Sequence, residues 1–481
     1  MKPGPWQLEP PPLQEGAARN LAPPPGDEAD QRACGLPGAL LPDWRETFLA
    51  AFARALHRYR AFRHHLEACV GCGACTRACP FFLATGDPLN IPAARADLAR
   101  RVYRRHFAPG RRPRPQALSR SLVERWRTYF HQCSLCRRCA RWCPLGIDTA
   151  EVTRVCREIL AAVGLTAAPA ASGAAQTYRT GNSRGISPAS WISRNRNLET
   201  ELKRLTGRDI ACPVDLHGAE VLLVAPAADL ARFKATYRGY AKTFHAAGVS
   251  WTTSTYLAEA DDWGGYLDYR NLRLIHRRVR EAARELKPRL ILWGESGHGW
   301  RVARIWGATL AGSWAREDYL SLKAPMHVLE WAHHLLRRGA FVGRLQREAN
   351  QGRIVTYHDP CHLARSCGLV AEPRDLIRAA CVAFHDMPPD SIGPRTLCCG
   401  FGGGLAGWED RTHLVSLAGF LPRARALAWT ARRHGTNWVA TACDLCKRGL
   451  SAALSHYRLD YAYGGVMELV GNALYPEPGG G

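Results

Sequence analysis

The sequence lacks any apolar run approaching the roughly 18 residues of a transmembrane helix, so it predicts no span of a bilayer. Residues 1–12 also lack the basic start and the apolar stretch of a secretory signal. We therefore expect a protein of a reducing, cytoplasmic compartment, in which its 18 cysteines remain free to bind metal. A framework of disulfides is disfavoured for the same reason.

Acidic residues are scarce. The 481 residues include 42 Asp and Glu against 65 Lys and Arg, which gives a formal net charge of +23. Arginines gather at 100–105, 111–114 and 137–141. This charge favours an acidic partner protein or an anionic membrane surface, or it is simply a solvated arginine-rich surface. Zinc-finger spacing and an RNP-like aromatic run are missing, so we expect no nucleic acid partner.

Two cysteine runs dominate what the sequence does contain. Each has the spacing Cys-x-x-Cys-x-x-Cys-x-x-x-Cys-Pro, one beginning at Cys69 and the other at Cys133. In bacterial ferredoxins with this spacing, three close cysteines bind one [4Fe–4S] cubane and the fourth ligates the other cubane. Structural zinc, with paired Cys-x-x-Cys arms, fits less well. The sequence predicts two cubanes: cluster one on Cys69, Cys72, Cys75 and Cys143, and cluster two on Cys133, Cys136, Cys139 and Cys79.

The segments around these runs have amphipathic helical patterns, at 44–66, 92–103, 118–130 and 149–163. Asp148 is a plausible N-cap for the last of them. We expect an α-helical ferredoxin domain at 41–165. A Pro- and Gly-rich extended arm at 1–40 would precede it, and a linker at 166–215, ending in a charged helix, would follow it.

Beyond the linker, short apolar strand patterns alternate with helical segments, and they occur at 221–226, 288–293, 353–357 and 438–442. Such alternation predicts parallel sheets covered by helices. We expect two α/β lobes, at 216–325 and 350–476. The fold class is then α+β and multidomain, with a helical two-cluster domain followed by two parallel-sheet lobes.

A second group of cysteines lies in the C-terminal lobe and comprises Cys361, Cys398, Cys399, Cys443 and Cys446. Because strand ends converge on one edge of a parallel sheet, we expect a single metal site with soft thiolate ligands. The glycines at 402–404 let the backbone approach it closely. A phosphate loop is the alternative, but the Walker lysine and the G-x-G-x-x-G spacing are absent. Ordinary buried or redox-active cysteines are another alternative. Four solitary cysteines are interpreted as buried structural thiols: Cys34, Cys156, Cys212 and Cys381.

The pattern Cys-x₃₆-Cys-Cys-Gly-x₄₂-Cys-x-x-Cys resembles the CCG cysteine-rich domain of heterodisulfide reductases. Further stretches, at 69–105, 129–151, 294–302, 355–362 and 469–474, extend the resemblance over most of the chain. The chain is similar to heterodisulfide reductases of the HdrD type. It is most similar to the DsrK group, the iron–sulfur subunits of the DsrMKJOP membrane complex of sulfur metabolism. The resemblance implies a non-cubane [4Fe–4S] cluster on the five C-terminal cysteines, which cleaves disulfides by one-electron steps. The first lobe would be a degenerate CCG lobe.

The resemblance also implies partners. These are a haem b membrane subunit of the DsrM type, the other DsrMKJOP subunits, and a small sulfur carrier of the DsrC type as disulfide or trisulfide substrate. The protein would lie on the inner face of the cell membrane, attached through a partner subunit. His298, His358 and His362 lie in or beside the matching segments and are candidate proton donors, with a structural role as the alternative. Ser296 stands where relatives often carry a cysteine.

Other functions share this layout. The iron–sulfur subunit of a glycolate-, lactate- or glycerol-phosphate-type dehydrogenase would be an electron conduit without a sulfur substrate. A second CCG motif in the middle lobe would favour that group, and the sequence lacks one. A binding protein with structural clusters is a further alternative, which the charge favours and the two-cluster spacing disfavours.

Overall fold

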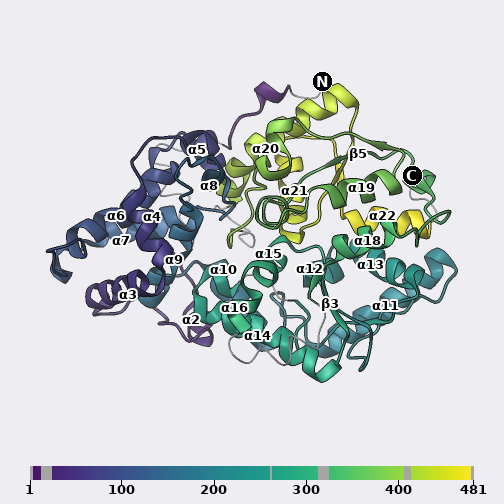
Figure 1. Ribbon diagram of the computed structural model, residues 1–481, viewed down its shortest axis with the longest axis horizontal. Helices are drawn as coiled ribbons and strands as arrows, with labels where there is room; N and C mark the ends of the chain where they lie inside the picture. Colours follow the sequence, from purple (N-terminus) through teal and green to yellow (C-terminus); the bar gives the residue numbers. More distant parts are fainter. Residues whose placement is uncertain (1–3, 12–23, 260–262, 312–323, 406–412, 478–481) are drawn as a thin grey trace.

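Aromatic side chains at helical spacing hold the N-terminal helical domain together. Phe48 and Phe52 pack against Trp126, and Trp126 packs against Phe130 with ring centroids 4.9 Å apart. The computed structural model describes residues 4–11, 24–259, 263–311, 324–405 and 413–477 (Figure 1). The helices of this domain are α3 (Trp44–Arg58), α4 (Arg60–Ala68), α5 (Pro80–Thr85), α6 (Pro92–His106), α7 (Arg120–His131), α8 (Arg138–Trp142) and α9 (Thr149–Ala162). The Asp148 carboxylate accepts hydrogen bonds from the first turn of α9, as predicted.

The expected linker contains a buried helix. Residues 166–215 include α10 (Ala168–Thr180) and α11 (Pro188–Thr206). Four alanines of α10 are buried. Small side chains give little periodic signal, yet they allow a helix to pack closely. Part of the expected arm is also helical, since α2 (Glu28–Ala33) packs on α10. The rest of the arm at 1–3 and 12–23 lies outside the described residues.

Each of the two following lobes contains a four-stranded parallel sheet. The first has the order β2-β1-β3-β4, with β1 (Val221–Val224), β2 (Trp251–Thr252), β3 (Leu290–Trp293) and β4 (Met326–His327). The second has the order β6-β5-β7-β8, with β5 (Ile354–Tyr357), β6 (Ala383–Phe384), β7 (Trp438–Ala440) and β8 (Ala462–Gly464). The predicted fold class is confirmed. The expected boundary at residue 325 is displaced, because β4 and the helix after it belong to the first lobe.

The helices of the first lobe are α12 (Ala227–Ala231), α13 (Lys234–Ala247), α14 (Tyr269–Leu286), α15 (Gly297–Arg301), α16 (Gly307–Ala311) and α18 (Val328–Arg337). Those of the second are α19 (Ala371–Ala380), α20 (His413–His434), α21 (Asp444–His456) and α22 (Val466–Leu474). Among the described residues, none of the helices has the length and apolar character that crossing a bilayer requires.

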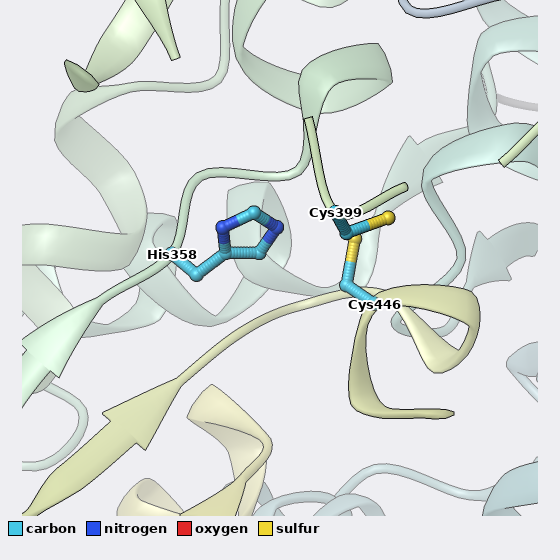
Figure 2. A group of neighbouring side chains, drawn as sticks. All are labelled: His358, Cys399 and Cys446. Carbon is cyan, nitrogen blue, oxygen red and sulfur yellow. The ribbon is translucent and has the colours of Figure 1, made fainter. Parts of the chain in front are cut away.

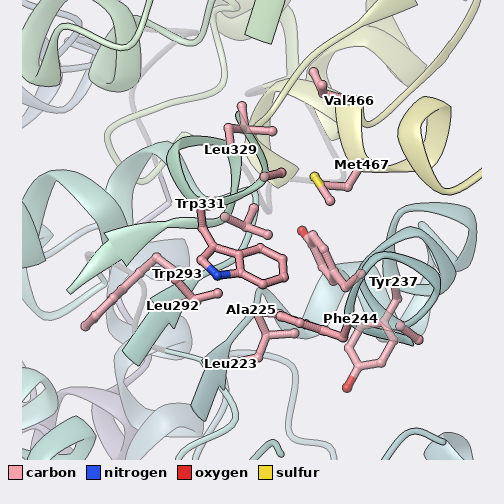
Figure 3. Packing of buried hydrophobic residues seen from close by; sticks show 14 of the residues in the cluster. Leu223, Ala225, Tyr237, Phe244, Leu292, Trp293, Leu329, Trp331, Val466 and Met467 are labelled. Carbon is pink, nitrogen blue, oxygen red and sulfur yellow. The ribbon is translucent and has the colours of Figure 1, made fainter. Parts of the chain in front are cut away.

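The two lobes share one hydrophobic core. Figure 3 shows part of this core, which includes Val466 and Met467 of α22, from the second lobe, and Tyr237 and Leu292 of the first. Helices α13 and α22 cross at a pair of glycines. A Cβ atom added to Gly239 would lie 2.1 Å from the Met467 carbonyl oxygen, and one added to Gly471 would lie 2.6 Å from the Gly239 Cα. The lobes are therefore fixed relative to each other by direct backbone packing.

We expect Gly239→Ala to destabilise the protein by about 2 kcal/mol, because the methyl group forces α13 and α22 apart. The melting temperature should fall by about 4 °C or more when thermal unfolding is followed under anaerobic conditions. Gly307→Ala is the matched control, since its added Cβ would make an ordinary contact, 3.6 Å from the His276 Nε2. Equal melting temperatures for both variants would contradict the role of this helix crossing.

Candidate metal centres

The cysteines predicted to bind cluster two come together from both runs. Burial raises the pKa of Cys79; Arg95 opposes this shift, and the neighbouring thiols Cys133 and Cys136 add to it. The Cys139 Sγ lies 2.7 Å from the Thr149 hydroxyl at the start of α9. The fourth cysteine of the first run therefore lies with the second run, as the ferredoxin spacing requires.

The cysteines predicted to bind cluster one line a hollow at the protein surface: Cys69, Cys72, Cys75 and Cys143. Burial raises the pKa of Cys75, and the adjacent thiols Cys69 and Cys143 raise it further. Cys72 is exposed. Val70 and Leu145 line the same hollow and are 75% and 46% exposed. The cluster-one cysteines thus reach solvent beside exposed apolar side chains.

The cysteines predicted to bind cluster two border the C-terminal lobe. Cys136 packs against Cys361 and Cys398 in one buried group. The Ser134 hydroxyl lies 3.1 Å from the Cys398 Sγ. Arg365, which follows Cys361, donates hydrogen bonds to the carbonyls of Cys136 and Thr396. The second cysteine run and the C-terminal cysteines are therefore parts of one continuous buried region.

The five C-terminal cysteines gather at the carboxyl edge of the second sheet. Cys361 follows β5 and begins the π-helical turn η9 (His362–Ser366), whereas Cys443 follows β7 and Cys446 lies in the first turn of α21. All five are buried. The ligand atoms of His358, Cys399 and Cys446 lie within 4.8 Å of one another (Figure 2). Hydrogen bonds from Cys398 and Cys446 lower the pKa of the Cys399 thiol.

Glycines allow the backbone to lie close to the five C-terminal cysteines. The Gly400 N–H donates to the Cys398 Sγ at 3.2 Å, and Gly400 adopts a positive φ of 76°. A Cβ atom added to Gly403 would lie 2.8 Å from the Cys133 carbonyl oxygen. One added to Gly297, from the first lobe, would lie 3.5 Å from the Cys443 Sγ. The backbone therefore lies close to the sulfurs at Gly400 and Gly297, and close to the segment that carries Cys133 at Gly403.

The three predicted histidines all reach this site. His298 enters from α15 of the first lobe, and its Nδ1 lies 2.6 Å from the Tyr266 hydroxyl. The rings of His298 and His362 are 4.5 Å apart. Burial lowers the pKa of both His358 and His362, so both imidazoles are neutral near pH 7. Within the described part of the chain, their ring nitrogens have no hydrogen-bond partner, although they are buried.

Sequence reasoning did not identify Tyr266. It lies in a short 3₁₀ turn, η5 (Gly264–Tyr266), far along the chain from every cysteine, and no motif marks it. Lys447 directly follows Cys446. Its Nζ lies 2.6 Å from the Asp229 Oδ1 and 3.3 Å from the Glu295 Oε2, in the first lobe.

This ion-paired group stabilises the start of α21. Burial raises the pKa of Glu295 to about 7, and Lys447 acts against that shift. Although burial lowers the pKa of Lys447, the two carboxylates raise it, so the lysine stays charged. Breaking a buried pair costs about 3–5 kcal/mol when one partner is removed. Lys447 therefore connects the two lobes through its ion pairs and holds the adjacent Cys446 in position.

The donor atoms at this site suit an iron–sulfur centre. Five sulfurs and neutral imidazoles gather there, and soft thiolates favour iron–sulfur clusters, zinc or copper(I) over magnesium or calcium. Buried guanidinium groups can offset the negative charge of such clusters. Arg95 beside Cys79 and Arg423 beside Cys399 and Cys446 are so placed. The residues present fit the predicted groups in donor type, burial and charge.

Comparison with known proteins agrees with this arrangement. A family described as a 4Fe-4S dicluster domain matches residues 65–147, and the CCG family, described as a cysteine-rich domain, matches 355–451. The chain is 34% identical over 468 residues to the "Hdr-like menaquinol oxidoreductase iron-sulfur subunit 2" of Archaeoglobus fulgidus, covering 90% of this chain and 84% of that protein. An Archaeoglobus profundus relative, an "Hdr-like menaquinol oxidoreductase iron-sulfur subunit", is 33% identical, covering 90% and 83%.

A more distant relative comes from Methanosarcina barkeri. It is HdrD of the dihydromethanophenazine:CoB--CoM heterodisulfide reductase, with 25% identity over 438 residues. The match covers 85% of this chain and 94% of that protein. The similarity therefore runs through the helical domain and both lobes.

We expect Cys399→Ser to remove the C-terminal centre and leave the two cubanes in place. Anaerobically purified protein should then fall from about 12 to about 8 iron atoms per chain. Cys381→Ser is the matched control, because Cys381 is equally buried but lies outside the site. Iron and sulfide analysis of both variants measures the difference. Equal iron contents would contradict the assignment of Cys399 as a ligand that this centre requires.

Proposed function

Because the chain belongs to the family of heterodisulfide-reductase-like iron–sulfur subunits, we propose that it transfers single electrons between a membrane partner and a sulfur–sulfur bond. It is an oxidoreductase subunit of a membrane-associated complex. Electrons would enter or leave at cluster one, pass through cluster two, and reach the C-terminal cysteines, where a disulfide or trisulfide is cleaved or formed.

One observation carries this proposal. Cys136 of cluster two packs against Cys398 and Cys361 of the C-terminal site, within one buried group. The exposed cysteine, Cys72, lies instead in cluster one. The three groups of cysteines thus form a series from the surface to the interior. A series of this kind suits electron transfer, and structural clusters would not require it.

We assign two cubane clusters to the ferredoxin cysteines and one non-cubane [4Fe–4S] cluster to the five C-terminal cysteines. When bound, these groups supply one-electron chemistry and, at the C-terminal site, iron to which sulfur has high affinity. The chain supplies the surroundings. His358 and His362, neutral and without partners in the described part of the chain, can each donate an N–H to a sulfur atom. The Tyr266 hydroxyl, 2.6 Å from the Nδ1 of His298, orients that ring.

For the partner and the substrate, the resemblance to the DsrK group supports a finer proposal. The electron partner is a haem b membrane subunit of the DsrM type, within a DsrMKJOP-like assembly on the inner face of the membrane. The substrate is the disulfide or trisulfide of a DsrC-type sulfur carrier. The matching segments 294–302 and 355–362 contain His298, His358 and Cys361, which line the proposed reaction site.

The test is low-temperature EPR of the oxidised, iron-loaded protein, recorded with and without the oxidised sulfur carrier. We expect a paramagnetic signal that changes with the sulfur substrate, because oxidised cubanes of the ferredoxin type have no signal. Cys399→Ser should lack this signal and Cys381→Ser should keep it. A spectrum with only two reducible cubanes, and with no change on adding substrate, would instead favour the other function. The chain would then be the electron-transfer subunit of a glycolate-, lactate- or glycerol-phosphate-type dehydrogenase.

The apolar rim of cluster one should be the docking site of the membrane partner. We expect the double variant Val70→Glu and Leu145→Glu to slow reduction by that partner at least about ten-fold, because docking would bury two carboxylates. Reduction by dithionite should be unchanged. Val342→Glu is the control, since Val342 is 79% exposed and lies in another lobe. Stopped-flow absorbance measures both rates, and equal slowing with dithionite would point to damage to the cluster.

A further inference from the structure

A concave basic surface lies at the C-terminal end of α6 and in the loop that leads to α7. Its volume is about 580 Å³, and it is lined mainly by Arg101, Arg104, Arg105, Arg111, Arg112 and Arg114. We call this surface the arginine hollow. It lies outside both lobes, in the part of the helical domain that projects farthest from them (Figure 1). Neither the electron path nor the C-terminal site uses these residues.

Most of these guanidinium groups have no counter-charge. Asp97 pairs with Arg101 at 2.9 Å and also with Arg100. In the described part of the chain, no ion pair or hydrogen bond is made by the side chains of the other five arginines. The loop itself is held in place, because the Arg114 N–H donates to the His106 Nδ1 at 3.1 Å. Five like charges are thus held close together around one concavity.

The dipole of α6 accounts for only some of the arginines in the hollow. Arg104 and Arg105 lie in the last turn of α6, where a cation interacts favourably with the helix dipole. Arg111, Arg112 and Arg114 lie in the loop, where no dipole favours them. Like charges this close repel each other, so the hollow should bind anions. Guanidinium forks match phosphate oxygens in geometry and charge.

We propose that the arginine hollow binds the phosphate groups of anionic phospholipids, so that the helical domain rests directly on the bilayer surface. A protein partner fits less well, because protein interfaces have an apolar core. None of the exposed large hydrophobic residues among the described ones lies between positions 101 and 114. The hollow offers charge without an exposed large apolar side chain in this stretch, which suits a layer of headgroups.

The position of the hollow supports the same partner. Helix α6 begins at the cluster-one hollow, which Ala93 lines, and ends at the arginine hollow. At about 1.5 Å per residue, Arg104 lies about 17 Å along the helix from Ala93. Contact with lipid would therefore keep cluster one close to the membrane. Lipid contact would add to attachment through a partner subunit, and it is independent of the sulfur chemistry.

The test is co-sedimentation of the iron-loaded, full-length protein with vesicles. We compare phosphatidylcholine vesicles with vesicles that contain about one third phosphatidylglycerol. We expect binding to the anionic vesicles only, with loss of binding as salt rises to about 0.5 M. The triple variant Arg111→Gln, Arg112→Gln and Arg114→Gln should weaken this binding about a hundred-fold.

The control is a second triple variant, Arg194→Gln, Arg196→Gln and Arg204→Gln, which removes three exposed arginines of α11. It should bind within about two-fold of the wild type, since these arginines lie outside the hollow. Equal loss of binding in both triple variants would show that binding depends on the total charge of the protein and not on the hollow. That result would overturn the proposal. Visible spectra of both variants, with the clusters intact, confirm that they fold.

Two further experiments distinguish the binding of lipid from the binding of other anions. Inorganic phosphate at the same phosphate concentration should not protect the hollow arginines from a guanidine-modifying reagent, whereas anionic vesicles should. Protection by free phosphate without vesicle binding would assign the hollow to a soluble phosphate compound. A hollow-dependent interaction with an acidic protein or a nucleic acid, without vesicle binding, would also overturn the proposal. Each of these results leaves the proposed electron transfer standing.

Discussion

The guanidinium of Arg157 makes the contacts on which the proposed electron path depends. It lies on α9, is 2% exposed, and donates to the carbonyls of Phe130 and Cys133 and, across the domain boundary, to that of Gly403. A buried charge is costly unless polar groups surround it. Here the carbonyls that accept from the arginine belong to the end of α7, to Cys133 and to the glycine run of the second lobe. One side chain therefore links the segment that carries Cys133 to the glycine run beside the C-terminal cysteines, and so sets the spacing between two of the proposed metal centres.

The two sheets have the same strand order, and the segments that follow β3 and β7 meet at the boundary between the lobes. The Asp444 N–H donates to the Glu295 carbonyl at 3.0 Å across this boundary. The segment after β7 carries Cys443 and Cys446, whereas the segment after β3 carries Ser296 and His298. The first lobe thus has no cysteine in this segment, yet it supplies a histidine and the buried carboxylates that pair with Lys447.

The sequence could predict features that depend on local spacing. The four central strands, the capped helix after Asp148 and the position of Cys79 near the second cysteine run all follow from short patterns. Features that depend on packing could not be predicted. Strands β2, β4, β6 and β8 are two or three residues long, too short to show a period. Tyr266 contacts His298, and Arg157 contacts Gly403, but no sequence pattern links the two residues of either pair.

The structure explains part of the excess of arginine in the sequence. Buried or half-buried arginines surround the predicted cluster ligands, including Arg95 and Arg138 near cluster two, and Arg365 and Arg423 near the C-terminal cysteines. Four thiolates give an iron–sulfur cluster a net negative charge, and nearby cations favour its reduced form. These arginines are explained by the charge of the cofactors. The arginine hollow is a different case, because five of its guanidinium groups have no counter-charge among the described residues, and an anion from outside the chain would supply it.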